Sequence, residues 1–121
     1  MNPVKTLVMG ASTNPGRYAY RAMKMLQRYG HPVVAVGKKE EDLDGLKIHK
    51  EHVQFDDLDT VTLYLNPMNQ QQYYDYIVGL KPRRVIFNPG TENPALYSIL
   101  KENNIEIEVA CTLVMLSINQ Y

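Results

Sequence analysis

Short apolar runs separated by polar segments recur along the whole chain. Four of them occupy residues 6–9, 32–36, 61–65 and 84–87, and apolar positions alternate with acidic ones over residues 105–109. Apolar runs of this length, bounded by glycine, proline or asparagine, are typical of buried β-strands. The pattern therefore predicts five strands.

Helical spacing of apolar residues occurs between these strands. Between residues 19 and 26 apolar side chains recur at intervals of three and four, and Gly30 is placed to cap the end of that helix. Asn66 and Asn93 each precede a proline, an arrangement that begins helices. We expect helices at these places and a last helix in the apolar tail over residues 112–118.

Strands that alternate with helices imply crossover connections and a mostly parallel sheet. The sequence predicts an α/β fold: one doubly wound, Rossmann-like domain over residues 1–121 with a five-stranded, mostly parallel sheet. The polar stretch over residues 38–59 is expected to be a long connection with little regular structure.

The charge and cysteine content exclude several classes of protein. Thirteen Lys and Arg residues balance thirteen Asp and Glu residues, so we expect neither a nucleic-acid-binding protein nor a polybasic membrane-surface protein. No apolar run approaches the roughly 20 residues of a membrane span. One cysteine permits no internal disulfide and no four-cysteine zinc site. Without a signal peptide at its start, the chain is expected to be soluble and cytoplasmic.

Asparagine precedes five of the seven prolines. Three of these pairs, which begin at Asn14, Asn66 and Asn88, come just after a predicted strand. Asn-Pro is a common turn and helix-entry signal. In open parallel sheets, however, ligands bind beyond the carboxyl ends of the strands, and three such pairs at one edge favour a ligand crevice there.

The loop after the first strand is the strongest single signal. Gly10 ends the strand, and the backbone N–H groups of the loop and of the following helix can converge on an anion such as a phosphate. Ser12 and Thr13 add hydroxyl donors, and Arg17 adds a guanidinium. The loop matches neither the dinucleotide glycine motif nor the P-loop. A phosphate-binding turn is the favoured interpretation, and a purely structural turn is the alternative.

The end of the second strand indicates the kind of ligand. An NAD site has an acidic residue there to hold the ribose hydroxyls, whereas this chain has Gly37, Lys38 and Lys39. Lys38 favours a ligand with an additional phosphate, such as coenzyme A or NADP, over NAD. We expect Lys39 and the acidic residues 40–42 to belong to a solvated loop.

The remaining chemical candidates are weaker. His49 and His52 lie near three aspartates, but their spacing matches no metal signature. A nucleophilic cysteine needs a nearby base, and no histidine is close to Cys111 in the sequence, so a structural thiol is favoured. The sequence predicts no catalytic residue and no metal site.

A tyrosine-rich helix is predicted over residues 67–79. Tyr73, Tyr74 and Tyr76 lie on it, and at most two of them can face the core. Stacking on an adenine is one interpretation, and packing or a subunit contact is the other. The apolar tail over residues 113–118 can pack on the sheet or on a second subunit, which leaves a homodimer open.

The opening of the chain resembles a known family. Residues 8–12, followed by Asn14-Pro15 and Arg17, are similar to the start of the small bacterial CoA-binding proteins, which are related to the CoA-binding domain of the succinyl-CoA synthetase alpha subunit. Lys38, Pro67 and Cys111 also match that pattern. The resemblance covers essentially the whole chain.

The resemblance implies three groups of ligand-binding residues. Those that would hold the pyrophosphate, beside Gly10, are Ala11, Ser12, Thr13 and Arg17. Those that would meet the adenosine and its phosphate are Val36, Gly37 and Lys38. Those that would line the crevice beyond are Asn66, Pro67, Asn88, Pro89 and Gly90.

Three hypotheses on function follow. The first is a stand-alone CoA or acyl-CoA binding protein without catalytic machinery, whose partner is a small nucleotide ligand. The second is an NADP-binding enzyme or enzyme fragment on the same fold. The third is an interaction protein with a decayed nucleotide site, because Gly37 replaces the family's Asn-Pro before Lys38, no arginine lies near Asn66, and Val109-Ala110 replaces its Asp-Arg pair.

Overall fold

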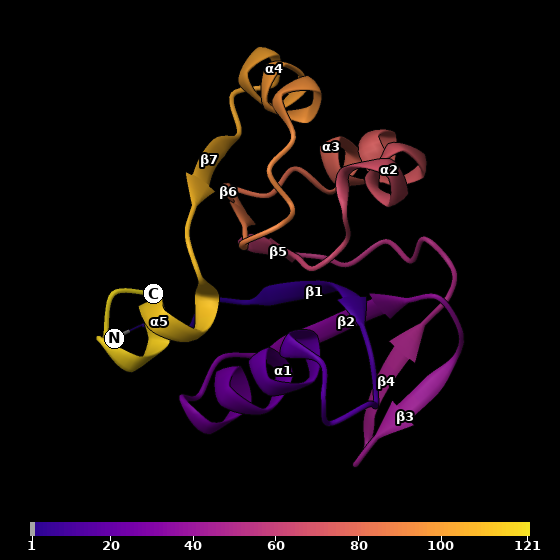
Figure 1. Ribbon diagram of the computed structural model, residues 1–121, viewed down its shortest axis with the longest axis vertical. Helices are drawn as coiled ribbons and strands as arrows, with labels where there is room; N and C mark the ends of the chain where they lie inside the picture. The colour runs from indigo at the N-terminus through magenta and orange to yellow at the C-terminus, as the bar shows by residue number, and fades with distance from the viewer. Residues whose placement is uncertain (1) are drawn as a thin grey trace.

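A single sheet of seven strands lies between two layers of helices in the computed structural model, which describes residues 2–121 (Figure 1). The strands are β1 (Thr6–Ala11), β2 (Val33–Gly37), β3 (Glu41–Leu43), β4 (Leu46–His49), β5 (Thr60–Leu63), β6 (Arg84–Phe87) and β7 (Glu106–Val109). Their order across the sheet is β3-β4-β2-β1-β5-β6-β7. The helices are α1 (Tyr18–Arg28), α2 (Pro67–Gln70), the 3₁₀ turn η1 (Gln71–Tyr73), α3 (Tyr74–Leu80), α4 (Pro94–Glu102) and α5 (Thr112–Ser117).

Neighbouring strands are parallel except for β3 and β4. Helix α1 forms the crossover from β1 to β2, the segment from α2 to α3 joins β5 to β6, and α4 joins β6 to β7. The predicted α/β, Rossmann-like and mostly parallel fold is confirmed, and the five predicted strands are β1, β2, β5, β6 and β7. The strand count of five is wrong.

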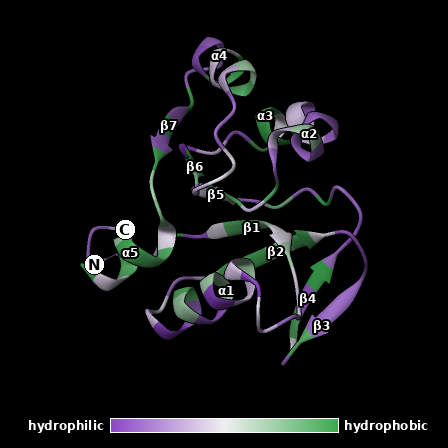
Figure 2. Ribbon diagram, in the orientation of Figure 1, coloured by the Kyte–Doolittle hydropathy of each residue, from purple (hydrophilic) through white to green (hydrophobic). Residues whose placement is uncertain are grey.

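The two unpredicted strands form a hairpin inside the stretch that we expected to lack regular structure. β3 and β4 pair in antiparallel register, and β4 adds to the parallel sheet beside β2. Asp44 and Gly45 both adopt positive φ at the turn, the conformation that two-residue hairpins prefer. β3 is short and largely hydrophilic (Figure 2), so no apolar run marks it.

Three predicted helix boundaries are confirmed. Gly30 follows α1 with a φ of +84°, which suits a glycine after a helix. The side chains of Asn66 and Asn93 each accept a hydrogen bond from the backbone N–H three residues further on. The tyrosine-rich helix predicted over residues 67–79 is divided into α2, η1 and α3.

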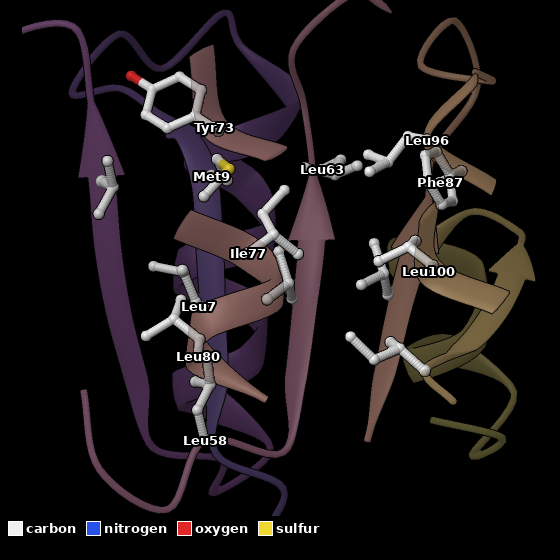
Figure 3. Packing of buried hydrophobic residues seen from close by; sticks show 14 residues of the cluster. Leu7, Met9, Leu58, Leu63, Tyr73, Ile77, Leu80, Phe87, Leu96 and Leu100 are labelled. Atoms are coloured by element: carbon white, nitrogen blue, oxygen red, sulfur yellow. The ribbon is translucent and has the colours of Figure 1, made fainter. Parts of the chain in front are cut away.

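The core lies on both faces of the sheet because its strands are covered on both sides. Leu7 and Met9 point to one face, where Ile77 and Leu80 of α3 cover them (Figure 3). Val8 points to the other face and packs with residues of α1 and α5. Two-sided burial explains why β1 is an unbroken apolar run rather than an alternating one.

Helix α5 packs on the sheet of its own chain. Leu116 is fully buried in the core beside α1, whereas Val114 and Ile118 are exposed. Of the helices in residues 2–121, none combines the length and the apolar character that crossing a membrane requires.

Candidate functional site

A cleft of about 680 Å³ opens at the carboxyl ends of β1, β2, β5 and β6. After β2 the chain crosses back to place β5 on the other side of β1, so the cleft lies where the strand order reverses, the usual ligand position in this class of sheet. Eight of the thirteen residues predicted for the site line it: Gly10, Ala11, Ser12, Arg17, Lys38, Asn66, Pro89 and Gly90.

The exit from β1 is shaped by Gly10. This residue has a φ of +91°, and a Cβ atom there would lie 3.0 Å from both the carbonyl carbon and oxygen of Tyr64. The missing side chain lets the first loop pass directly against the segment that follows β5. Within the loop, the hydroxyl oxygen of Ser12 accepts a hydrogen bond from the Asn14 N–H at 3.0 Å. The Asn14 side chain in turn accepts one from the Gly16 N–H at 2.9 Å.

The amino end of α1 faces this loop. Arg17 occupies the N-cap position with extended backbone, and no side-chain cap is found there in the described part of the chain. The first turn, which includes cleft-lining Tyr18 and Ala19, contains no acidic residue. The N–H groups and the dipole of this eleven-residue helix therefore favour an anion in the cleft.

Three cationic side chains belong to the lining of the cleft. Arg17, Lys38 and Lys39 line the cleft, and all three are exposed. Lys39 was expected to belong to a solvated loop, as was Glu41, which also lines the cleft. The Glu41 carboxylate accepts a hydrogen bond of 2.6 Å from the hydroxyl of Thr13, so the first loop is tied to β3. Sequence reasoning missed this link because it missed β3.

Two predicted residues at the end of β2 lie outside the cleft lining. Val36 is fully buried in the core. Gly37 is buried where a Cβ atom would come within 2.5 Å of the Ala11 carbonyl oxygen. Gly37 therefore permits the close approach of the β1 and β2 ends, which places Lys38 beside the first loop.

The segment after β5 provides an uncharged wall. Asn66 caps α2 by accepting a hydrogen bond of 2.9 Å from the Asn69 N–H, and both asparagines line the cleft beside Leu65. Pro67 takes the first helical position and is not among the lining residues. Pro89, Gly90 and Thr91 extend this wall from the end of β6.

Asn88 is buried beneath the cleft wall and is not among the lining residues. Its amide nitrogen donates to the Thr62 hydroxyl at 2.7 Å and to the Leu63 carbonyl at 2.8 Å. Its amide oxygen accepts from the Thr112 N–H at 2.8 Å. These bonds occupy both amide hydrogens and fasten the ends of β5 and β6 to the start of α5.

None of the three tyrosines considered for adenine stacking lines the cleft. Tyr73 is buried in the core, the Tyr74 hydroxyl accepts a hydrogen bond from the Asn93 amide, and the Tyr76 hydroxyl donates to a backbone carbonyl. The aromatic side chains that do line the cleft are Tyr18, which is 65% exposed, and Tyr64, whose pKa is raised by burial.

The histidines and the cysteine lie away from the cleft. His52 stacks on the Tyr76 ring with ring centroids 4.8 Å apart. Cys111 is partly buried at the start of α5 and is not among the lining residues. Across residues 2–121, no three His, Cys, Asp or Glu side chains gather closely enough to hold a metal ion.

Comparison with known proteins finds one matching family and several similar structures. The model of a family described as CoA binding domain matches residues 4–117. A solved structure of an uncharacterized protein is 49% identical to the chain, with a TM-score of 0.97 and complete coverage of both chains. A hypothetical protein from Pyrococcus horikoshii OT3 is 27% identical to the chain with a TM-score of 0.81, and the match covers 90% of this chain and 78% of the other. No curated protein matched the chain.

A further solved structure, of a protein redesigned for binding, shares the fold. It is 24% identical with a TM-score of 0.85, and the match covers 96% of this chain and 82% of the other. At that identity the likeness supports the arrangement of the seven strands and no more.

Proposed function

Because this chain belongs to the CoA binding domain family, we propose that it is a stand-alone protein that binds coenzyme A or acyl-CoA in the cleft at the carboxyl ends of the strands. The observation that carries the proposal is that Arg17, Lys38 and Lys39 line the same cleft as the first residues of α1, a helix whose amino end has no side-chain cap. Such a site favours a ligand with several phosphate groups.

The cationic side of the cleft suits the phosphate groups of coenzyme A, and the uncharged side suits its pantetheine arm. In this proposal the diphosphate lies against Ser12 and Arg17, and the phosphorylated ribose lies near Lys38. The uncharged pantetheine arm extends along the opposite wall, beside Asn66 and Gly90. The chemical basis is the uneven charge of the lining, because the lining residues in the segments after β5 and β6 contribute no ionised side chain.

We propose that the chain acts by binding rather than by catalysis. In the lining drawn from residues 2–121, the ionisable groups other than tyrosine are Arg17, Lys38, Lys39 and Glu41. Glu41 is already hydrogen-bonded to Thr13. This set provides cations for phosphates but no pairing of a nucleophile with a base.

Calorimetric titration with CoA, acetyl-CoA, dephospho-CoA, NADPH, NADH and ADP tests the proposal. We expect CoA and acetyl-CoA to bind most tightly, and we expect dephospho-CoA to bind less tightly because it lacks the ribose phosphate near Lys38. Replacing Arg17 or Lys38 by alanine should weaken CoA binding by about tenfold or more, the usual effect of removing a charged hydrogen-bond donor.

The control variant is Arg28→Ala, which removes an exposed cation from the opposite end of α1 and should leave the affinity unchanged. Lys38→Ala should also abolish the preference for CoA over dephospho-CoA. Binding of NADPH without CoA would show that the site serves NADP instead. Binding of none of these ligands would favour an interaction protein with a decayed site.

A further inference from the structure

One buried side chain connects the two loops that form the uncharged wall of the cleft. Gln70, the last residue of α2, is fully buried. Its amide nitrogen donates to the backbone carbonyls of Leu65 and Thr91, each at 2.8 Å. Its amide oxygen accepts from the Asn93 side chain at 2.9 Å, and Asn93 also donates to the Tyr74 hydroxyl at 2.8 Å.

Both carbonyls that Gln70 holds belong to residues that line the cleft. Leu65 lies in the loop after β5, and Thr91 lies in the loop after β6. The two loops are distant in sequence, and no other side chain in the described structure bonds to the backbone of both. Pairing of β5 with β6 and the bonds of Asn88 fix the strand ends below these loops, and Gln70 joins the loops themselves.

The network leaves no polar atom of Gln70 free. Both amide hydrogens and the amide oxygen have partners, so the side chain adds rigidity without an unsatisfied buried group. If the amide is removed, the Leu65 and Thr91 carbonyls lose their buried donor, which is a costly state. The loops must then move to bring these oxygens to water, and the wall loses its fixed width.

We propose that Gln70 is a positioning residue of the CoA site, acting through Leu65 and Thr91 rather than by touching the ligand. This inference rests on the proposed function, because it concerns the wall assigned to the pantetheine arm. It has a specific consequence. Gln70 should matter for ligands that carry the arm and should matter little for ligands that reach only the first loop and Lys38.

The test compares Gln70→Met with Gln72→Met, which makes the same change at an exposed glutamine two residues away. Each protein is titrated with CoA and with ADP, which lacks the arm. We expect Gln70→Met to weaken CoA binding by about tenfold, as for the loss of a buried hydrogen-bond pair, and to change ADP binding by less than about twofold. Gln72→Met should change neither.

The outcomes separate the positioning role from the proposed function. Unchanged CoA affinity in Gln70→Met would overturn the positioning role alone, and so would an equal loss for CoA and ADP, which indicates general destabilisation. Failure of the unaltered protein to bind CoA would overturn the proposed function and this inference with it.

If Gln70→Met does not fold, Tyr74→Phe provides the same comparison, because it removes only the hydroxyl that supports Asn93. We expect Tyr74→Phe to weaken CoA binding by about threefold and to leave ADP binding unchanged. An unchanged CoA affinity in a folded Tyr74→Phe protein would contradict the inference.

Discussion

At the scale of single residues, two glycines make the cleft possible by having no side chain. Gly10 lets the first loop pass against the backbone of Tyr64, and Gly37 lets the ends of β1 and β2 approach each other. Neither glycine contributes a functional group. Their role is to bring the loop donors, Arg17 and Lys38 into one place.

We predict opposite effects on stability for glycine-to-alanine substitutions at crowded Gly37 and at exposed Gly79. Gly37→Ala would place a Cβ atom 2.5 Å from the Ala11 carbonyl oxygen, which belongs to the backbone and cannot move freely. We expect it to lower the free energy of unfolding by about 2 kcal/mol or more. Gly79 lies exposed in α3, and a methyl group added there would have no neighbouring atom within 4 Å, so Gly79→Ala should raise that free energy by about 0.5–1 kcal/mol.

Urea denaturation of the two variants and of the unaltered protein measures both effects. Gly37→Ala should also weaken CoA binding, because it shifts Lys38 relative to the first loop. Equal stability of Gly37→Ala and the unaltered protein would show that the two strand ends do not need this close approach.

At the scale of secondary-structure elements, apolar runs and Asn-Pro pairs were sufficient to predict five strands and most helices. The hairpin of β3 and β4 was missed because its short strands mix charged with apolar residues, so no apolar run marks them. Asp44-Gly45 is a recognised hairpin turn signal and could have revealed it. Missing the hairpin also hid the positions of Lys39 and Glu41.

The candidate site was less predictable than the fold because side-chain direction depends on tertiary contacts. Asn88 and Asn66 both follow a strand and precede a proline, yet Asn88 is buried in the core and Asn66 lines the cleft. Gln70 is the first of three consecutive glutamines, and only packing shows that it is the buried one. No local pattern distinguishes these cases.

The opposite edge of the sheet, where the strands begin, contains a cluster of a buried histidine, a tyrosine and an arginine. His31, just before β2, is buried, and its Nδ1 accepts a hydrogen bond of 2.9 Å from the Val4 N–H. The Tyr121 ring lies 5.1 Å from the His31 ring, and the Arg84 guanidinium lies 4.7 Å from the Tyr121 ring. Burial, followed by the charge of Arg84, lowers the pKa of His31.

The lowered pKa of His31 determines whether the free energy of unfolding rises or falls with pH. In the unfolded chain His31 binds a proton below about pH 6.5. In the folded protein its lower pKa keeps it neutral until a more acidic pH is reached, so protonation between these two pH values favours unfolding. We expect the free energy of unfolding to fall as the pH drops below about 6.5, until the folded-state pKa is reached. Burial alone would raise the pKa of Asp59, but hydrogen bonds from Arg83 and Thr60 and the charges of Arg83 and Arg84 together lower it. Its effect on stability is therefore confined to more acidic pH.

Urea denaturation at about pH 7 and about pH 5.5 tests this expectation. His31→Asn keeps a side-chain acceptor for Val4 but cannot titrate, so it should reduce the loss of stability between the two pH values. The control is His52→Asn, because His52 is exposed, and it should retain that loss. An identical pH dependence in His31→Asn and the unaltered protein would assign the loss to other groups.

At the scale of the whole molecule, zero net charge conceals an uneven distribution. The chain has thirteen cationic and thirteen acidic residues, yet in the cleft lining drawn from residues 2–121 Arg17, Lys38 and Lys39 are accompanied by a single carboxylate, that of Glu41. The doubly wound topology produces this arrangement, because it brings loops from distant parts of the chain to one edge. A neutral protein can therefore present a cationic cleft to a small anionic ligand.

The exposed position of these cations predicts that ligand affinity depends on salt far more than stability does. The distance over which charges act falls from roughly 10 Å at 0.1 M salt to roughly 3 Å at 1 M. CoA binding should therefore weaken by about tenfold or more over that range, and Lys38→Ala should show a smaller change. Three of the four ion pairs of the described structure include a well-exposed partner, and the fourth joins buried Arg84 to half-buried Glu108. Exposed ion pairs contribute little to stability, so the melting temperature without ligand should change little. Titration and thermal denaturation across the same salt series measure both quantities. A CoA affinity that does not respond to salt would mean that the uncharged wall, rather than the cationic side of the cleft, supplies the binding energy.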